Sequence, residues 1–338
     1  MNAATLLVRA LADPKSVAGL DADRWTQLLA AARAEQLIGS LAHRLQGHAM
    51  PASARAILND AAFSAEQGQT HARWEAEMAR RALAPTDMRV VLLKGTAFVV
   101  AGLDAGVGRF VGDLDILVSR NAIDVAERAL LAAGWEWVKD DPYDSAYYRR
   151  WMHELPPMIH SERDRMIDVH HTILPLTAGP RPDAAALIAD SVLLENGLYA
   201  LSPADMIVHA SAHLLADGDL AGGLRNLWDI DRLVRQFSTE TGFWKKLRER
   251  SHKHQLADAV GRALRLSARL YETPIDRQLA GHPRLADRLY ARRLLARDGW
   301  GRQTRKFTRF LFYVRSHWIR MPPLMLARHL WTKARRSA

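Results

Sequence analysis

The chain has 338 residues, 49% of them hydrophobic, and its formal net charge is +10. A chain of this length and composition buries a sizeable core, in one large domain or in about two to three smaller ones. The absence of cysteine excludes disulfides and thiolate metal sites, and no apolar stretch is long enough to cross a membrane, so we expect a soluble cytoplasmic protein.

Helical periodicity dominates residues 1–86. Apolar residues at helical spacing predict helices over residues 2–12 and 22–48, the second beginning at an aspartate cap. An Ala-, Glu- and Arg-rich segment then predicts one long helix over residues 53–83. We expect this N-terminal region to form a packing shell that carries no chemistry.

The hydrophobic period changes to that of strands at Arg89, and the chain alternates predicted strands and helices to about Leu176, within a predicted core of residues 87–178. We predict a small mixed sheet of about four to five strands, which makes the fold class α+β. Residues 162–165 are typical of a hairpin turn, whereas the aromatic-rich segment 140–153 is expected to be a loop that covers the core or lines a pocket. The predicted strands are 90–93, 114–118, 135–139, 158–161 and 166–173, and the predicted helices are 97–102 and 121–133.

Two carboxylates stand on one predicted strand of this region. Asp113 and Asp115 flank Leu114, so on a strand of period two they leave the same face, with Cα atoms about 7 Å apart. Like charges this close repel each other, and a hard cation such as Mg²⁺ would keep both ionised. An isolated Asp-x-Asp is usually a solvated loop, but here a third carboxylate, Asp168, stands on a later strand. The combination predicts a divalent-metal site.

A cationic turn precedes these acids. The apolar run that ends at Leu93 is typical of a strand buried on both faces, and Lys94, Gly95 and Thr96 follow it as a predicted polar loop. Lys94 and, further on, Arg109 are suited to bind phosphate oxygens. The backbone amides of Gly95 and Thr96 would also approach a phosphate closely, because glycine has no Cβ.

This arrangement resembles the polymerase-β-like nucleotidyltransferase superfamily, in which a hydrophobic strand ends in Gly-Ser, a second strand carries paired acids and a later strand carries a third. It is most similar to the bacterial "nucleotidyltransferase family protein" group, including the flanking regions 25–45 and 201–234. The superfamily's serine is Thr96 here, and the separation of Gly95 from Asp113 is longer than usual. The matching residues are Leu93-Lys94-Gly95, Arg109, Asp113-Leu114-Asp115-Ile116-Leu117-Val118 and Asp168-Val169-His170.

The resemblance implies transfer of a nucleoside monophosphate from an NTP to an acceptor hydroxyl, with release of pyrophosphate. It implies that Asp113, Asp115 and Asp168 bind Mg²⁺ or Mn²⁺, with Asp168 on a second ion near the attacking oxygen. His170 shares a face with Asp168 by strand parity and would orient the acceptor, although a buried, hydrogen-bonded histidine is equally consistent. Asparagine at position 113 or 115 should abolish transfer and relieve carboxylate repulsion.

Residues 179–291 return to helical spacing and predict a C-terminal helical bundle, with helices over residues 201–215, 224–237, 243–254 and 255–271. His209 and His213 lie four apart on one helix face, but no third metal ligand accompanies them. We interpret them as structural. Nearby aspartates, among them Asp229, are expected to cap helices or to pair with arginines.

The charge of the chain is concentrated in a basic, aromatic tail over residues 292–338. This tail has thirteen Lys or Arg and one acid, Asp298, which gives +12. Residues 307–336 interleave aromatic and basic side chains, as in an amphipathic helix that binds an anionic membrane surface, an acidic partner or nucleic acid. A terminal helix docked on the bundle is equally consistent.

Two other classes of function fit the same features. One is a non-catalytic nucleotide-binding or antitoxin-like module, and three mutually repelling acids kept on one face argue against it. The other is a docking module whose tail carries the function, at the periphery of a membrane. The sequence identifies neither the nucleobase nor the acceptor.

Overall fold

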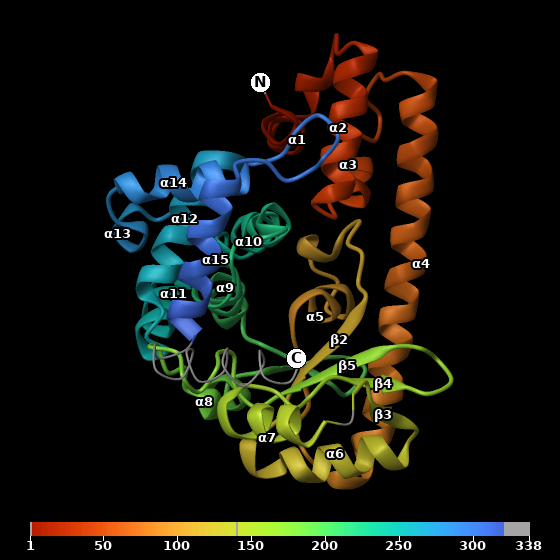
Figure 1. Ribbon diagram of the computed structural model, residues 1–338, viewed down its shortest axis with the longest axis vertical. Helices are drawn as coiled ribbons and strands as arrows, with labels where there is room; N and C mark the ends of the chain where they lie inside the picture. Colours follow the sequence, from red (N-terminus) through yellow and green to blue (C-terminus); the bar gives the residue numbers. More distant parts are fainter. Residues whose placement is uncertain (1, 140, 321–338) are drawn as a thin grey trace, which may run out of the picture.

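The computed structural model describes residues 2–139 and 141–320 (Figure 1). The described residues form one mixed sheet with helices around it, so the predicted α+β fold class is confirmed. The strands are β1 (Val91–Leu92), β2 (Asp113–Leu117), β3 (Trp135–Trp137), β4 (Met158–His160), β5 (Met166–His170), β6 (Val192–Leu193) and β7 (Tyr199–Ala200). The helices are α1 (Ala3–Ala12), α2 (Ala22–Ala34), α3 (Ile38–Arg44), α4 (Ala52–Leu83), α5 (Lys94–Val100), α6 (Ile123–Ala132), α7 (Pro142–Trp151), α8 (Ala184–Ala189), α9 (Pro203–Ala212), α10 (Gly223–Phe237), α11 (Phe243–Lys253), α12 (Ala257–Tyr271), α13 (Arg277–Ala280), α14 (Leu285–Leu294) and α15 (Lys306–Arg320).

Figure 1 shows α1 to α3 at one end of the molecule and the sheet with α6 and α7 at the other. The long helix α4 runs along one side and connects the two ends, and the helices from α9 onward form the opposite side. Buried apolar side chains of all three regions belong to one continuous core. The sheet is therefore packed between helices from both ends of the sequence, as the flanking helical regions predicted.

The sheet has the strand order β3-β4-β5-β2-β1-β7-β6. β2 is parallel to β5 and antiparallel to β1, and β4 and β5 form the predicted hairpin. The short edge strands β6 and β7 come from residues beyond 178, and β7 pairs in parallel with β1. The sheet therefore extends past residue 178, where the predicted core ends. The division of the chain into regions 1–86, 87–178, 179–291 and 292–338 stays a prediction.

Outside the segment that follows β1, two predicted elements were wrong. The predicted helix over residues 22–48 is two helices, because Gln36 adopts a left-handed φ of 54° and turns the chain between α2 and α3. The turn brings the buried carboxylate of Glu35 to 2.6 Å from Arg297. The predicted loop over residues 140–153 is largely helix α7, whose first residue is Pro142, a position that proline favours.

The C-terminal helices α9 to α12 agree with the predicted bundle. The predicted basic helix is present as α15, and the rest of the segment 307–336, from residue 321 onward, lies outside the described residues. One face of α15 is buried through Phe312, whose ring packs edge-on against Tyr290 at 4.9 Å. Within the described part of the chain, no helix combines the length and the apolar character needed to cross a membrane.

Candidate active site

The three predicted carboxylates meet on adjacent strands. The parallel pairing of β2 with β5 places Asp115 directly beside Asp168, and Asp113 lies two residues earlier on the same face of β2. One oxygen from each carboxylate lies within 4.8 Å of the other two. This separation suits a group of metal ligands, and it agrees with the strand parity from which the site was predicted.

The surroundings of the three acids differ, and so do their pKa values. Burial, with repulsion from Asp115 and Glu154, raises the pKa of Asp168 to about 7. Partial burial and the same neighbour Asp115 also raise the pKa of Asp113, which keeps an exposed edge. Burial alone would raise the pKa of Asp115, but Lys94 and His170 hold it well below its usual range. Asp115 is therefore the permanently ionised member.

Lys94 supplies the main counter-charge to Asp115. Its Nζ donates to Oδ1 of Asp115 at 2.6 Å. The predicted polar loop after β1 was wrong, because the chain passes directly into α5 at Lys94. Lys94 makes this junction with a left-handed φ of 48°, which is unusual for a residue with a side chain. Such a backbone costs about 1–3 kcal/mol, and here it aims the ammonium group at the carboxylates.

Gly95 allows a close approach of the Arg109 side chain. A Cβ at position 95 would lie 2.4 Å from Nε of Arg109, so any larger residue would displace the guanidinium. Arg109 also lies over the ring of Phe98, 5.7 Å from its centroid. The structure thus brings the predicted phosphate-binding residues Lys94, Gly95 and Arg109 together at the start of α5.

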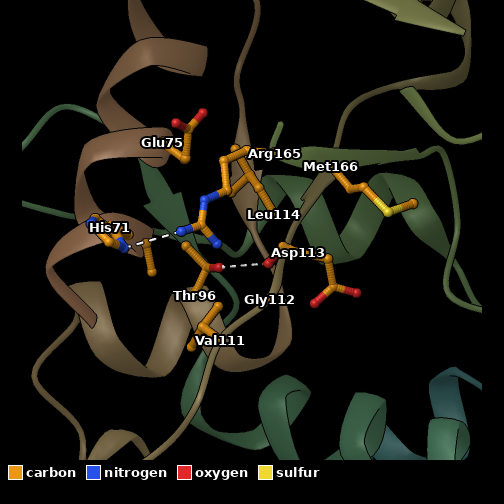
Figure 2. Close-up of a pocket in the computed structure, with 10 residues that line it drawn as sticks. His71, Glu75, Thr96, Val111, Gly112, Asp113, Leu114, Arg165 and Met166 are labelled. Carbon is orange, nitrogen blue, oxygen red and sulfur yellow. Dashed lines mark hydrogen bonds between the residues drawn. The ribbon is translucent and has the colours of Figure 1, made fainter. Parts of the chain in front are cut away.

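Thr96 faces away from this group. Its hydroxyl is buried and donates to the backbone carbonyl of Asp113 at 3.3 Å (Figure 2). Figure 2 also shows the side chains of His71 and Arg165 joined beyond this contact, where they bound a small pocket. The side chain of Thr96 therefore links α5 to β2. The backbone amide of Thr96 is the group that remains for the predicted phosphate contact.

Arg109 is held by a residue that sequence reasoning did not assign to the site. Its Nη1 contacts Oδ2 of Asp229 on α10, while Arg225 donates to Oδ1 of the same carboxylate at 2.7 Å. Arg225 also donates to Ser40 of α3 at 2.8 Å. The pairing of Asp229 with an arginine was predicted, but its link to Arg109 across 120 residues carries no signal in a single sequence.

His170 lies between two carboxylates. Its Nε2 is 3.0 Å from Oδ1 of Asp115, and its Nδ1 is 3.4 Å from Oε2 of Glu154. The ring of His153 lies 5.2 Å from the ring of His170 and is also near Glu154. His153 was missed because it ends the predicted loop 140–153, and Glu154 because it lies between that loop and the next predicted strand. His171 points elsewhere, toward Arg120.

A small cavity of about 40 Å³ separates α5 from the C-terminal helices. It is lined by Lys94 and Arg109 from the core and by His209, His213 and Asn226 from α9 to α10. Burial and the nearby Lys94 lower the pKa of His209 well below its usual value, so the ring is neutral. The two histidines interpreted as structural therefore lie next to the predicted phosphate-binding cations.

Comparison with known proteins identifies the family of the chain. A family model described as "Uncharacterised nucleotidyltransferase" matches residues 21–272, which include every predicted site residue. None of the curated proteins compared with the chain matches it. The match covers most of the chain and agrees with the resemblance seen in the sequence. The chain therefore belongs to this family of uncharacterised nucleotidyltransferases.

Proposed function

We propose that the protein transfers a nucleoside monophosphate from an NTP to an acceptor hydroxyl and releases pyrophosphate. Membership of the family implies an NTP as the donor. The observation that carries the proposal is the convergence of Asp113, Asp115 and Asp168, one oxygen of each lying within 4.8 Å of the others. A purely structural site gains nothing from three mutually repelling carboxylates.

The residues present suit a divalent cation such as Mg²⁺ or Mn²⁺. Among the described residues, Oδ1 of Asp168 is buried and has no hydrogen-bond partner. Both described hydrogen bonds of the Asp115 carboxylate are made by Oδ1, which leaves its Oδ2 for another ligand. We propose that Asp113, Asp115 and Asp168 hold the cation, which when bound would neutralise charge on the phosphates and on the attacking oxygen.

The cations at the start of α5 would bind the triphosphate. Arg109 is fixed by Asp229 and keeps a buried Nε that has no partner among the described residues. Lys94 would exchange Oδ1 of Asp115 for a phosphate oxygen when the nucleotide enters. Both side chains line the cavity between α5 and α9 to α10, which supports this position for the phosphates.

Of the two roles that the sequence left open for His170, we propose that of a buried, hydrogen-bonded histidine. Because both of its nitrogens face carboxylates, it has no described atom directed toward an acceptor. We propose that it positions Asp115 by donating a hydrogen bond from Nε2 to Oδ1. Its buried position on β5, 1% exposed, supports a fixed role over a mobile one.

The raised pKa of Asp168 predicts a pH dependence for the metal-free protein. The folded state keeps a proton on Asp168 up to about pH 7, whereas an unfolded aspartate releases it near a pKa of about 3.9. The free energy of unfolding should therefore fall as pH rises from about 4 to about 7. The change that Asp168→Asn causes in the free energy of unfolding should therefore be more stabilising at about pH 8 than at about pH 5. Urea unfolding in the presence of EDTA measures this change at both pH values. An equal effect at both pH values would contradict this assignment.

The proposed reaction is tested by the fate of differently labelled phosphates. The protein is incubated with Mg²⁺ and each NTP in cell lysate, with the label at the α or the γ phosphate. We expect the α label to be retained by one class of molecule, and the γ label to leave as pyrophosphate. Retention of the γ label instead would identify phosphoryl transfer, and retention of neither would refute the proposal.

We also propose that α15 docks on an anionic membrane surface. The face of α15 opposite the bundle exposes Phe307, Phe310, Leu311, Val314 and Trp318, with Phe307 and Trp318 exposed by 74% and 66%. These positions recur at helical spacing and form one apolar stripe, called here the α15 stripe. Exposed Arg302, Arg305 and Lys306 lie beside its beginning. An apolar stripe flanked by basic residues is typical of helices that lie in an anionic membrane interface.

The stripe predicts binding to vesicles of anionic lipid. Phe310→Ser with Trp318→Ser should remove most co-sedimentation with these vesicles, because two large apolar side chains no longer enter the interface. Trp74→Ser is the matched control, since Trp74 is 54% exposed on α4. Equal binding by the double variant and the control, or equal binding to neutral vesicles, would rule out this surface.

A further inference from the structure

The chain folds a second group of metal-ligating side chains beside the three aspartates. An isolated bridge pairs Glu154 with His170 at the end of β5, and His153 precedes Glu154 in the chain. One ligand atom from each of these three residues lies within 4.8 Å of the others. This group shares no member with the aspartate site, and it contains two nitrogens and one oxygen where that site offers oxygens alone.

The distances within the group exceed hydrogen bonds and match the edges of a coordination tetrahedron. Oε2 of Glu154 lies 3.4 Å from Nδ1 of His170 and 3.6 Å from Nε2 of His153. Ligands about 2.0–2.1 Å from a tetrahedral Zn²⁺ are separated from one another by roughly 3.4 Å. The Glu154 oxygen is therefore spaced from each of the two ring nitrogens as two ligands of one central ion are.

The histidines also lack the partners that a hydrogen-bonded network would give them. Nδ1 of His170 is buried and has no hydrogen-bond partner among the described residues, and the same is true of Nδ1 of His153. Both residues are more than nine-tenths buried. A cation bound at Nδ1 of His170 would give this buried nitrogen a partner, whereas His153 faces Glu154 through Nε2.

Asp115 fixes the form of the His170 ring. An ionised carboxylate only accepts hydrogen bonds, so Nε2 of His170 carries the proton that it directs to Oδ1 of Asp115. In the neutral ring, Nδ1 then has a lone pair that faces Oε2 of Glu154 at 3.4 Å. Two lone pairs facing each other repel unless a proton or a metal cation lies between them. A carboxylate behind a histidine in this way is the usual outer support of a metal ligand.

We propose that His153, Glu154 and His170 bind a transition-metal cation of the Zn²⁺ type, with water as the fourth ligand. Two imidazoles and one carboxylate favour Zn²⁺, whereas Mg²⁺ favours oxygen ligands, so the two neighbouring sites select different ions. The Zn²⁺ site stands independently of the proposed transfer reaction. Through His170, an ion bound there would also hold Asp115 in place.

The test uses the full-length protein, stripped with chelator and placed in excess Mg²⁺ so that the aspartate site does not take up the probe. We expect the protein to bind one equivalent of Zn²⁺. One equivalent of Co²⁺, added in its place as a spectroscopic probe, should give the visible absorption of a tetrahedral Co²⁺ ion with nitrogen and oxygen ligands. Glu154→Gln and His153→Gln should weaken Zn²⁺ binding by at least about 100-fold, because even the outer partners of a metal site contribute about 10- to 100-fold. His171→Gln, a buried neighbour that points to Arg120, should bind as the wild type does.

Asp113→Asn separates this proposal from the proposed function. It should keep Zn²⁺ binding and lose the stabilisation by Mg²⁺ with NTP, while Glu154→Gln should lose Zn²⁺ binding and keep the response to Mg²⁺ with NTP in part. The Co²⁺ spectrum of the unaltered protein decides the question if a variant does not fold. Failure of the wild type to bind Zn²⁺ stoichiometrically, or equal binding by Glu154→Gln and His171→Gln, would overturn the proposal.

Discussion

Asp113→Asn and Asp115→Asn should each lower nucleotidyl transfer by at least about a thousandfold. Each change removes an ionised ligand of the proposed cation, whose charge stabilisation is worth several kcal/mol, and each 1.36 kcal/mol is about tenfold in rate. The measurement is transfer of the α label by purified protein to the acceptor class found in lysate. Activity within about tenfold of the wild type in either variant would remove these residues from the chemistry.

The same two variants should differ in stability when metal is absent. Asp113→Asn relieves repulsion from Asp115, which contributes to the raised pKa of Asp113, so its melting temperature should rise. Asp115→Asn removes the ionised partner of both Lys94 and His170, so its melting temperature should fall. The sequence treats the two acids as equivalent, whereas their different partners in the structure predict opposite shifts. Melts in EDTA that shift in the same direction would contradict this distinction.

Asp229→Ala should lower the free energy of unfolding by about 3–5 kcal/mol, because it leaves two buried guanidinium groups without their carboxylate. Asp229 has a side chain only 4% exposed, and it pairs with Arg109 and Arg225. Denaturant unfolding measures this loss. NTP binding by the variant should also weaken, since Arg109 is no longer held over Gly95.

The control for Asp229 is an exposed acid in a comparable pair. Asp258 is 85% exposed at its side chain and pairs with Arg284 at 3.1 Å. Asp258→Ala should change the free energy of unfolding by no more than about 0.5 kcal/mol, as is usual for surface substitutions. A similarly small effect of Asp229→Ala would mean that the ion pairs of Asp229 with Arg109 and Arg225 contribute little to the stability of the fold.

Sequence reasoning located the aspartate site because its signals are local. The alternation of Asp113, Leu114 and Asp115 on a strand determines which face the acids share, and the hairpin turn before β5 returns Asp168 to the sheet. Both are properties of short segments with a fixed period. The residues that reach the site from α10 and from the segment before β4 follow from tertiary packing, and a single sequence has no period that predicts them.

The missed elements have the same physical origin. β6 and β7 are two residues long, too short for any alternation to be recognised, and they form only because β1 offers an unpaired edge. The break between α2 and α3 lies in a sequence of good helix formers, where the ion pair of Glu35 with Arg297 outweighs local preference. Tertiary contacts decided these cases, whereas hydrophobic period decided the long helices and the central strands.

The most direct test of the central claim is the change in melting temperature on adding Mg²⁺ with NTP to wild type, Asp113→Asn and Asp115→Asn. Ligands that bind only the folded state raise its stability by an amount that grows with the logarithm of their free concentration relative to Kd. We predict a rise for the wild type that EDTA abolishes and that neither variant shows. An unchanged rise in both variants would contradict binding of metal and nucleotide at Asp113, Asp115 and Asp168.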